Sequence, residues 1–143
     1  MRQNGLFRSH PMTSANRATR VAIAGLGTIG RVLARRLHAG IPGLTLACAA
    51  AQDRAKAQAW LDGQGIHCPL VDLDELPRHA DLAIECAPAA IIERICRPML
   101  EAGKAVMVLS CGALLERPAL VDLARERAAR SLCRRVRFWG SMR

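Results

Sequence analysis

Three glycines near the start of the chain have a spacing that can serve phosphate chemistry. Gly25, Gly27 and Gly30 form the pattern Gly-x-Gly-x-x-Gly directly after the apolar run 21–24. In a strand–turn–helix, the first glycine permits a tight turn, the second lets the backbone approach a pyrophosphate, and the third lets the helix pack closely on the strand. The preceding run predicts a buried strand and the following residues an amphipathic helix, so this context indicates a dinucleotide-binding turn.

The residue that meets the adenosine ribose is expected about 20 residues further on, at the end of the second strand. Asp53 stands there and could accept a hydrogen bond from a ribose hydroxyl, or it could simply cap the next helix. Arg54 could meet the 2′-phosphate of NADP or be a solvated helix residue. The sequence therefore leaves the choice between NAD and NADP open.

The remaining reactive side chains form no catalytic or metal-binding pattern in the sequence. Glu85 and Cys86 are expected to line the crevice at the end of a strand. Cys111 lacks a supporting His or Asn arrangement, so a packed thiol is its expected role. The four histidines are scattered and the six cysteines include no Cys-x-x-Cys pair, so we predict neither a catalytic residue nor a metal site. Unpaired thiols are typical of a reduced, intracellular protein, here expected to be cytoplasmic.

The elements that must position these residues alternate along the chain. Apolar runs predict strands at residues 21–24, 44–49, 67–71, 81–88 and 104–110. Helical spacing predicts helices at residues 29–37, 53–61, 90–102 and 118–130. The run 104–110 is apolar on both faces, which is typical of a central parallel strand, and residues 110–113 after it are expected as a loop beside the nicotinamide. This rhythm predicts a Rossmann-type, doubly wound parallel α/β sheet in three layers, with a ligand crevice at the carboxyl ends of its strands.

The strongly basic composition argues little about partners. The net charge is +9, but residues 1–20 and 131–143 contain eight arginines and no acid, while the rest of the chain is nearly neutral. A nucleic-acid-binding domain is expected to carry a basic face with stacking aromatics, and aromatic residues make up only 3% of this chain. We therefore expect no nucleic-acid partner. No apolar stretch has the length of a membrane span, so we expect no membrane partner either.

Several stretches resemble the L-aspartate dehydrogenases, an NAD(P)-dependent family related to homoserine dehydrogenase in its nucleotide-binding domain. The run 21–30 resembles the opening of that family, and Glu85-Cys86-Ala87-Pro88 its fourth-strand turn. Residues 100–104 and 108–114 resemble its most specific stretch. The likeness covers about residues 20–130.

The resemblance implies oxidation of L-aspartate to iminoaspartate with hydride transfer to NAD or NADP, in NAD biosynthesis, by a homo-oligomeric enzyme. It implies a cofactor held at Gly25, Gly27, Thr28, Ile29, Gly30, Asp53, Ala87 and Ala113, the last near the nicotinamide. The catalytic histidine of the family lies in a following substrate domain, so it cannot be assigned to a residue here, and we expect this chain to be inactive alone. The alternative is a stand-alone, non-catalytic NAD(H)-binding module.

The two ends of the chain depart from the family pattern. Residues 1–19 are expected to be a disordered leader, with the true start at Met1 or Met12, and residues 20–130 the NAD(P)-binding domain. Residues 131–143 can be encoded by codons that, read from one preceding base, give the expected continuation of the family. We therefore hypothesise a frameshift near Arg130, with an out-of-frame tail, no substrate domain and a possible pseudogene.

Overall fold

The sheet is parallel throughout, and helices connect its strands. The computed structural model describes residues 17–130, and the predictions for residues 1–16 and 131–143 lie outside this part of the chain. Within the described residues the strands are β1 (Thr19–Ala24), β2 (Leu44–Ala50), β3 (Leu82–Glu85) and β4 (Ala105–Val108). Their order is β2-β1-β3-β4, and each neighbouring pair is parallel. The predicted Rossmann-type α/β fold is confirmed.

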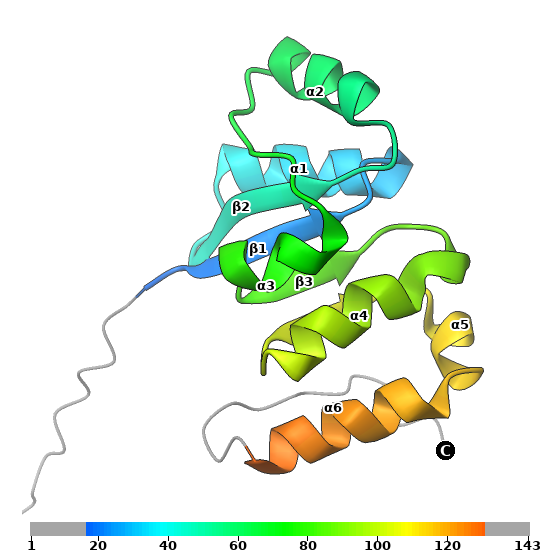
Figure 1. Cartoon of the computed structure of the whole chain (residues 1–143). Coiled ribbons are helices and arrows are strands. Elements are labelled where there is room, and N and C mark those ends of the chain that lie inside the picture. Colours follow the sequence, from blue (N-terminus) through cyan, green and yellow to red (C-terminus); the bar gives the residue numbers. More distant parts are fainter. Residues whose placement is uncertain (1–16, 131–143) are drawn as a thin grey trace, which may run out of the picture.

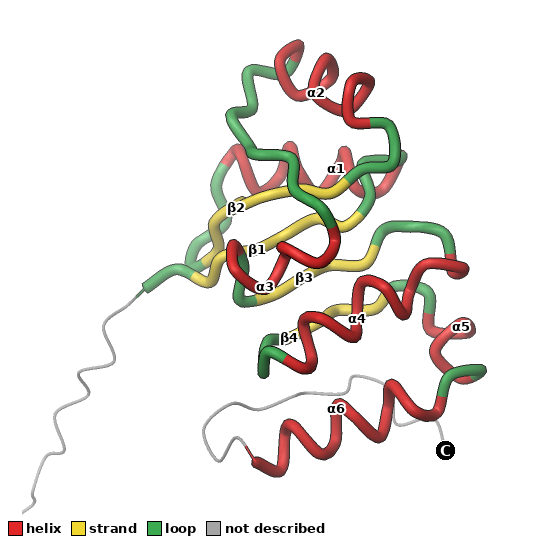
Figure 2. The backbone as a smooth tube through the Cα atoms, viewed as in Figure 1, coloured by secondary structure: helices red, strands yellow, loops and turns green. Residues whose placement is uncertain are grey.

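Helices cover both faces of the sheet, which gives the three predicted layers. Figure 1 shows α3 and α4 on one side of the strands and α1 on the other, and Figure 2 shows α6 running beside α4. The helices of the described residues are α1 (Thr28–Ala39), α2 (Arg54–Gly63), α3 (Leu76–His79), α4 (Ile92–Glu101), α5 (Cys111–Leu115) and α6 (Pro118–Arg130), with 3-10 turns at Leu73–Glu75 and Ala89–Ile91. None of these helices is long and apolar enough to cross a bilayer.

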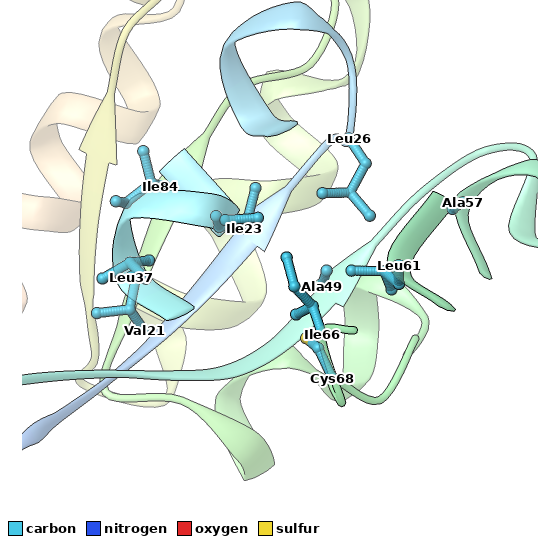
Figure 3. Close-up of a cluster of buried hydrophobic side chains, with 11 residues drawn as sticks. Val21, Ile23, Leu26, Leu37, Ala49, Ala57, Leu61, Ile66, Cys68 and Ile84 are labelled. Atoms are coloured by element: carbon cyan, nitrogen blue, oxygen red, sulfur yellow. The ribbon is translucent and has the colours of Figure 1, made fainter. Parts of the chain in front are cut away.

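The apolar composition of β1 follows from its central position. Residues 21–24 are all fully buried, and successive side chains point to opposite faces of the sheet. Val21 and Ile23 belong to the cluster under α1 and α2, where Leu37 and Leu61 meet them (Figure 3). Ala22 and Ala24 belong to the cluster under α3 and α4. A strand that is covered on both faces and paired on both edges has no position for a polar side chain.

The predicted central position of residues 104–110 is not found within the described residues. In the sheet of residues 17–130, β4 pairs only with β3 and lies at an edge. Its Val106 and Val108 pack toward α4 and α6, whereas Met107, on the other face, is 49% exposed. Apolar residues on both faces therefore occur here without cover on both faces. Residues 111–115, partly expected as a loop, form the short helix α5.

The third predicted strand, at residues 67–71, is reduced to one isolated parallel bridge between Ala49 and Leu70. The Pro69 carbonyl accepts from the Ala49 amide, and the Val71 amide donates to the Ala49 carbonyl, at 3.0 and 2.9 Å. Because proline has no N–H to donate, Pro69 interrupts the ladder. The segment still lies along the outer edge of β2, where the Rossmann order places its third strand.

A group of three charged side chains joins the amino ends of three strands. Asp81, just before β3, accepts from Arg20 of β1 at 2.9 Å and from Lys104, just before β4, at 3.2 Å. It also accepts from the backbone N–H of Arg20. The hydrogen bonds from Arg20 hold the pKa of the Asp81 carboxyl well below its usual range. These contacts fix the end of the sheet opposite the crevice.

Candidate cofactor-binding site

A cavity of about 980 Å³ opens at the carboxyl ends of β1, β2 and β3. This position is the expected one, because the crossover from β1 leaves toward β2 and the crossover after β2 returns to the other side of β1. Four chain segments supply most of its wall, namely residues 24–28, 50–53, 71–74 and 86–88. The remainder comes from α1, α2, α4 and the 3-10 turn before α4.

Gly25 fits its place because a side chain has no room there. Its φ is +111°, a conformation that L-residues rarely adopt, and its N–H donates to the Ala50 carbonyl at 2.8 Å. A Cβ at this position would lie 2.6 Å from the Cys86 carbonyl oxygen. The turn after β1 is therefore pressed against the turn after β3, and both line the cavity.

The other two glycines of the motif differ in what surrounds them. A Cβ on Gly30 would lie 1.8 Å from the Gly25 carbonyl oxygen, so Gly30 serves close packing of α1 on the turn, and it does not line the cavity. A Cβ on Gly27 would meet nothing within 4 Å. Gly27 and Thr28 line the cavity, whereas Ile29 is 57% exposed and lies outside its wall.

At the end of β2, Asp53 and Arg54 have different surroundings. Asp53 lines the cavity and caps α2, because its Oδ1 accepts from the Lys56 amide at 2.9 Å. Arg54 does not itself line the cavity: it donates to the carboxylate of Asp72, a residue of the wall, at 2.9 Å and to the Leu70 carbonyl at 2.7 Å. Asp53 thus caps α2 and also lines the cavity. Arg54 is hydrogen-bonded to the segment beside β2.

Three cations in the cavity wall were not singled out from the sequence: Arg31, Lys56 and, from α4, Arg94. Arg31 donates from Nε to the Leu26 carbonyl at 3.1 Å, and its guanidinium lies 5.2 Å from the centre of the Trp60 ring. Lys56 lines the wall from the first turn of α2. The one available signal was position, since Arg31 directly follows the glycine motif and Lys56 comes three residues after Asp53.

Glu85 was expected to line the crevice, but its side chain is fully buried behind the wall. Its Oε1 accepts from the Ala87 amide at 3.1 Å and the Ser110 hydroxyl at 3.2 Å. Its Oε2 accepts from the amides of Leu109 and Ser110 at 3.2 and 2.9 Å. One carboxylate therefore joins the turn after β3 to the turn after β4, a role that sequence position alone does not reveal.

The remaining predicted residues divide between the wall and its surroundings. Ala87 and Cys86 line the cavity. Burial, and to a smaller extent the charge of Glu85, raises the pKa of the Cys86 thiol to about 11, so this thiol is protonated at neutral pH and is a poor nucleophile. Ala113, in α5, packs against the cluster under α4 and α6 and is not part of the wall. Cys111 is exposed, although a packed thiol was expected.

The wall has the features that a dinucleotide requires. Gly27 leaves open space where a side chain would otherwise stand, and the first turn of α1 beside it contains no acidic residue. The N–H groups at a helix start are unpaired within the helix, and the helix dipole favours an anion there. Among residues 17–130 no group of three His, Cys, Asp or Glu side chains could hold a metal ion. The open space at Gly27 and the start of α1 suit the phosphate of an organic cofactor.

Two proteins with similar sequences are named L-aspartate dehydrogenases. The chain is 48% identical over 101 residues to L-aspartate dehydrogenase 3 of Bordetella bronchiseptica, covering 70% of this chain and 37% of that one. It is 44% identical over 117 residues to L-aspartate dehydrogenase of Bradyrhizobium diazoefficiens, covering 82% and 41%. The chain thus spans about two fifths of the length of these relatives.

Solved structures show the same fold in dehydrogenases. The scyllo-inositol dehydrogenase of Lactobacillus casei matches with a TM-score of 0.64 at 21% identity, covering 79% of this chain and 35% of that one. GenD2 of gentamicin A biosynthesis, in complex with NAD, matches with a TM-score of 0.61 at 27% identity, covering 78% and 33%.

A family description covers most of the chain. Residues 25–133 match "Homoserine dehydrogenase, NAD binding domain", a span that includes the glycine turn, the end of β2 and the turn after β3. With the cavity described above, this match identifies the cofactor as NAD or NADP. The chain belongs to the family of the homoserine dehydrogenase NAD-binding domain.

Proposed function

We propose that this chain is the NAD(P)-binding part of an L-aspartate dehydrogenase. The enzyme would oxidise L-aspartate to iminoaspartate and transfer the hydride to NAD or NADP, in a step of NAD biosynthesis. The observation that carries the proposal is the cavity between the glycine turn, the end of β2 and the turn after β3, in a chain 44–48% identical to two proteins named L-aspartate dehydrogenase. When bound, the cofactor supplies the hydride acceptor.

The residues of the wall have distinct tasks in this proposal. The amides at Gly27 and Thr28 bind the pyrophosphate, and Gly25 and Gly30 shape the turn that presents them. Asp53 accepts from a ribose hydroxyl, and Ala87 contacts the other half of the dinucleotide. Ile29 and Ala113 lie outside the wall, so we propose supporting positions for them.

Binding and turnover are separable in this proposal. No histidine lines the cavity, and hydride transfer requires a substrate held in near-attack geometry. We therefore propose that residues 17–130 bind the cofactor and that further residues of the enzyme hold L-aspartate. We propose a cytoplasmic location, which suits the five free thiols of the described residues.

The alternative is a non-catalytic NAD(H)-binding module. It is favoured by one observation: within residues 17–130 the cavity is lined by residues 24–94, which include the glycine turn and the end of β2. Such a module would bind the cofactor and respond to its redox state without converting a substrate.

Titration of the purified chain with NADH and with NADPH, followed by an assay of L-aspartate oxidation, tests both candidates. The chain is titrated alone and again after mixing with the substrate domain of the Bradyrhizobium relative. Aspartate-dependent NADH formation in the mixture supports the dehydrogenase. Cofactor binding without turnover in any combination favours the module, and absence of binding of both NADH and NADPH contradicts both candidates.

A further inference from the structure

Arg31 is held in a fixed position beside the cavity. Its Nε–H donates to the Leu26 carbonyl at 3.1 Å, and its guanidinium lies over the ring of Trp60 at 5.2 Å. Among residues 17–130 its two terminal nitrogens have no hydrogen-bond partner. Leu26 belongs to the glycine turn and Trp60 to α2, so the guanidinium stands between these two elements and its free N–H groups are available to a ligand.

Lys56 provides a second cation on the same side of the cavity. It lies on the first turn of α2, and its backbone N–H donates to Asp53. Its Nζ forms no ion pair with the described residues, while the neighbouring Arg54 is paired with Asp72. Arg54, the sequence candidate for a phosphate contact, is therefore paired with Asp72 of the wall. Of the three cations that line the wall, Arg31 comes from α1, Lys56 from α2 and Arg94 from α4.

The place of these cations corresponds to one end of a dinucleotide. In this fold the adenosine ribose lies beyond the end of the second strand, which here is Ala50, followed by Gln52 and Asp53 in the wall. A planar guanidinium with free N–H groups matches the geometry of a phosphate, and an ammonium adds a second positive charge. Three carboxylates also line the wall: Asp53, which has one oxygen engaged in the helix cap, Asp72, which is paired with Arg54, and Asp74.

We propose that Arg31, assisted by Lys56, forms a subsite for the 2′-phosphate of the adenosine ribose, so that the cavity binds NADP at least as tightly as NAD. The inference rests on the proposed function, because it requires that the cavity hold a dinucleotide. Asp53 remains available to the ribose 3′-hydroxyl, which NAD and NADP share. Arg31 thus determines specificity, and the pyrophosphate contacts supply affinity common to both cofactors.

Binding of NADH and NADPH to Arg31→Gln, measured by calorimetry on the full chain, tests the subsite. We expect the Kd for NADPH to rise about tenfold, because a charge-assisted bidentate contact is lost, while the Kd for NADH changes less than about twofold. Lys56→Gln should shift the same ratio by a smaller factor. Arg35→Gln, an exposed arginine of α1 outside the wall, is the matched control and should leave both Kd values unchanged.

Comparison of NADH and NADPH binding distinguishes a specific role of Arg31 at the 2′-phosphate from a structural role in the wall. If Arg31→Gln weakens NADH and NADPH equally, Arg31 only supports the wall through Trp60 and Leu26, and the inference is overturned. A wild-type chain that binds NADH clearly more tightly than NADPH also overturns it. Binding of neither dinucleotide would contradict the proposed function itself, whereas binding of both with an unchanged ratio in Arg31→Gln would contradict only the subsite.

Discussion

The two ends of β3 each carry an acidic residue, and the two carboxylates are satisfied in different ways. Asp81, at the amino end, lies between the cations Arg20 and Lys104, and its side chain is 21% exposed. Glu85, at the carboxyl end, is fully buried and accepts from three backbone amides and one hydroxyl, without a cation.

The difference shows how ion pairs can fix one end of a sheet while the other end keeps charged side chains in the wall of a cavity. At the amino end, Arg20 and Lys104 are both paired with Asp81, which thereby links the starts of β1, β3 and β4. At the carboxyl end, Glu85 accepts from amides and a hydroxyl, and none of these hydrogen bonds comes from a cation of the wall. A carboxylate bound by amides fixes the shape of the adjacent turns and leaves Arg31 and Lys56 to a ligand.

At the carboxyl end of the sheet, a substitution of Gly30 should give the largest loss of stability. Gly30→Ala places a Cβ 1.8 Å from the Gly25 carbonyl oxygen, so the backbone of the turn or the helix must move. We expect a loss of more than about 3 kcal/mol in the free energy of unfolding, or a chain that does not fold. Urea denaturation measures it, and a loss below about 1 kcal/mol would show that the turn is not tightly packed.

Two substitutions of Glu85 distinguish the effect of its hydrogen-bonding shape from the effect of its charge. Glu85→Ala leaves buried amides without an acceptor and should cost about 3–5 kcal/mol of unfolding free energy. In Glu85→Gln the amide NH2 can face the Ser110 hydroxyl, so only the Ala87 N–H loses its acceptor, and the cost should be about 1–2 kcal/mol. Equal costs for the two variants, by urea denaturation, would contradict this account of the network.

Asp81 sharpens the comparison through pH. Because its pKa is lowered in the folded state, its contribution is complete above the unfolded pKa of about 4 and is lost as the pH falls below that value. Because the ion pairs of Asp81 are partly exposed, Asp81→Asn should lower the free energy of unfolding by only about 1 kcal/mol at pH 7. The loss should become progressively smaller toward pH 2. Urea denaturation of both proteins across this range gives the difference, and a difference independent of pH would argue against the ion pairs.

Substitution of Asp53 should change the stability only slightly, through the cap of α2. Asp53→Ala removes the cap of α2 and should cost about 1 kcal/mol, whereas Asp53→Asn retains an acceptor for the Lys56 amide and should cost little. Thermal unfolding of the two variants measures the difference. Comparable losses in both would mean that the charge of Asp53, and not its cap, stabilises this end of the molecule.

The fold was largely predictable because its elements carry local signals. The glycine motif after a buried run predicted β1 and α1, and Pro118 predicted the start of α6. The position of β4 was not predictable, since an apolar run does not reveal which of its faces is covered. The proline that interrupts the third strand was visible in the sequence, but its effect depends on pairing with Ala49.

The candidate site was predictable only in part, for a different reason. Gly25, Gly27 and Asp53 are recognised by spacing, but the roles of the long side chains depend on contacts between distant segments. Arg54 is paired with a residue 18 positions away, and Glu85 holds amides 24 and 25 positions away. Such partners follow from the crossovers of the sheet and have no local signature.

The central claim, that the glycine turn binds the pyrophosphate of NAD(P), is tested most directly at Gly27. Its φ is −81° and an added Cβ meets nothing within 4 Å, so Gly27→Ala should fold with unchanged stability. Gly63→Ala, which also adds an unopposed Cβ but lies outside the wall, is the matched control. The account predicts that calorimetric titration with NADH shows saturable binding to the wild type and to Gly63→Ala, and binding at least about tenfold weaker to Gly27→Ala. Equal affinity in all three proteins would contradict it.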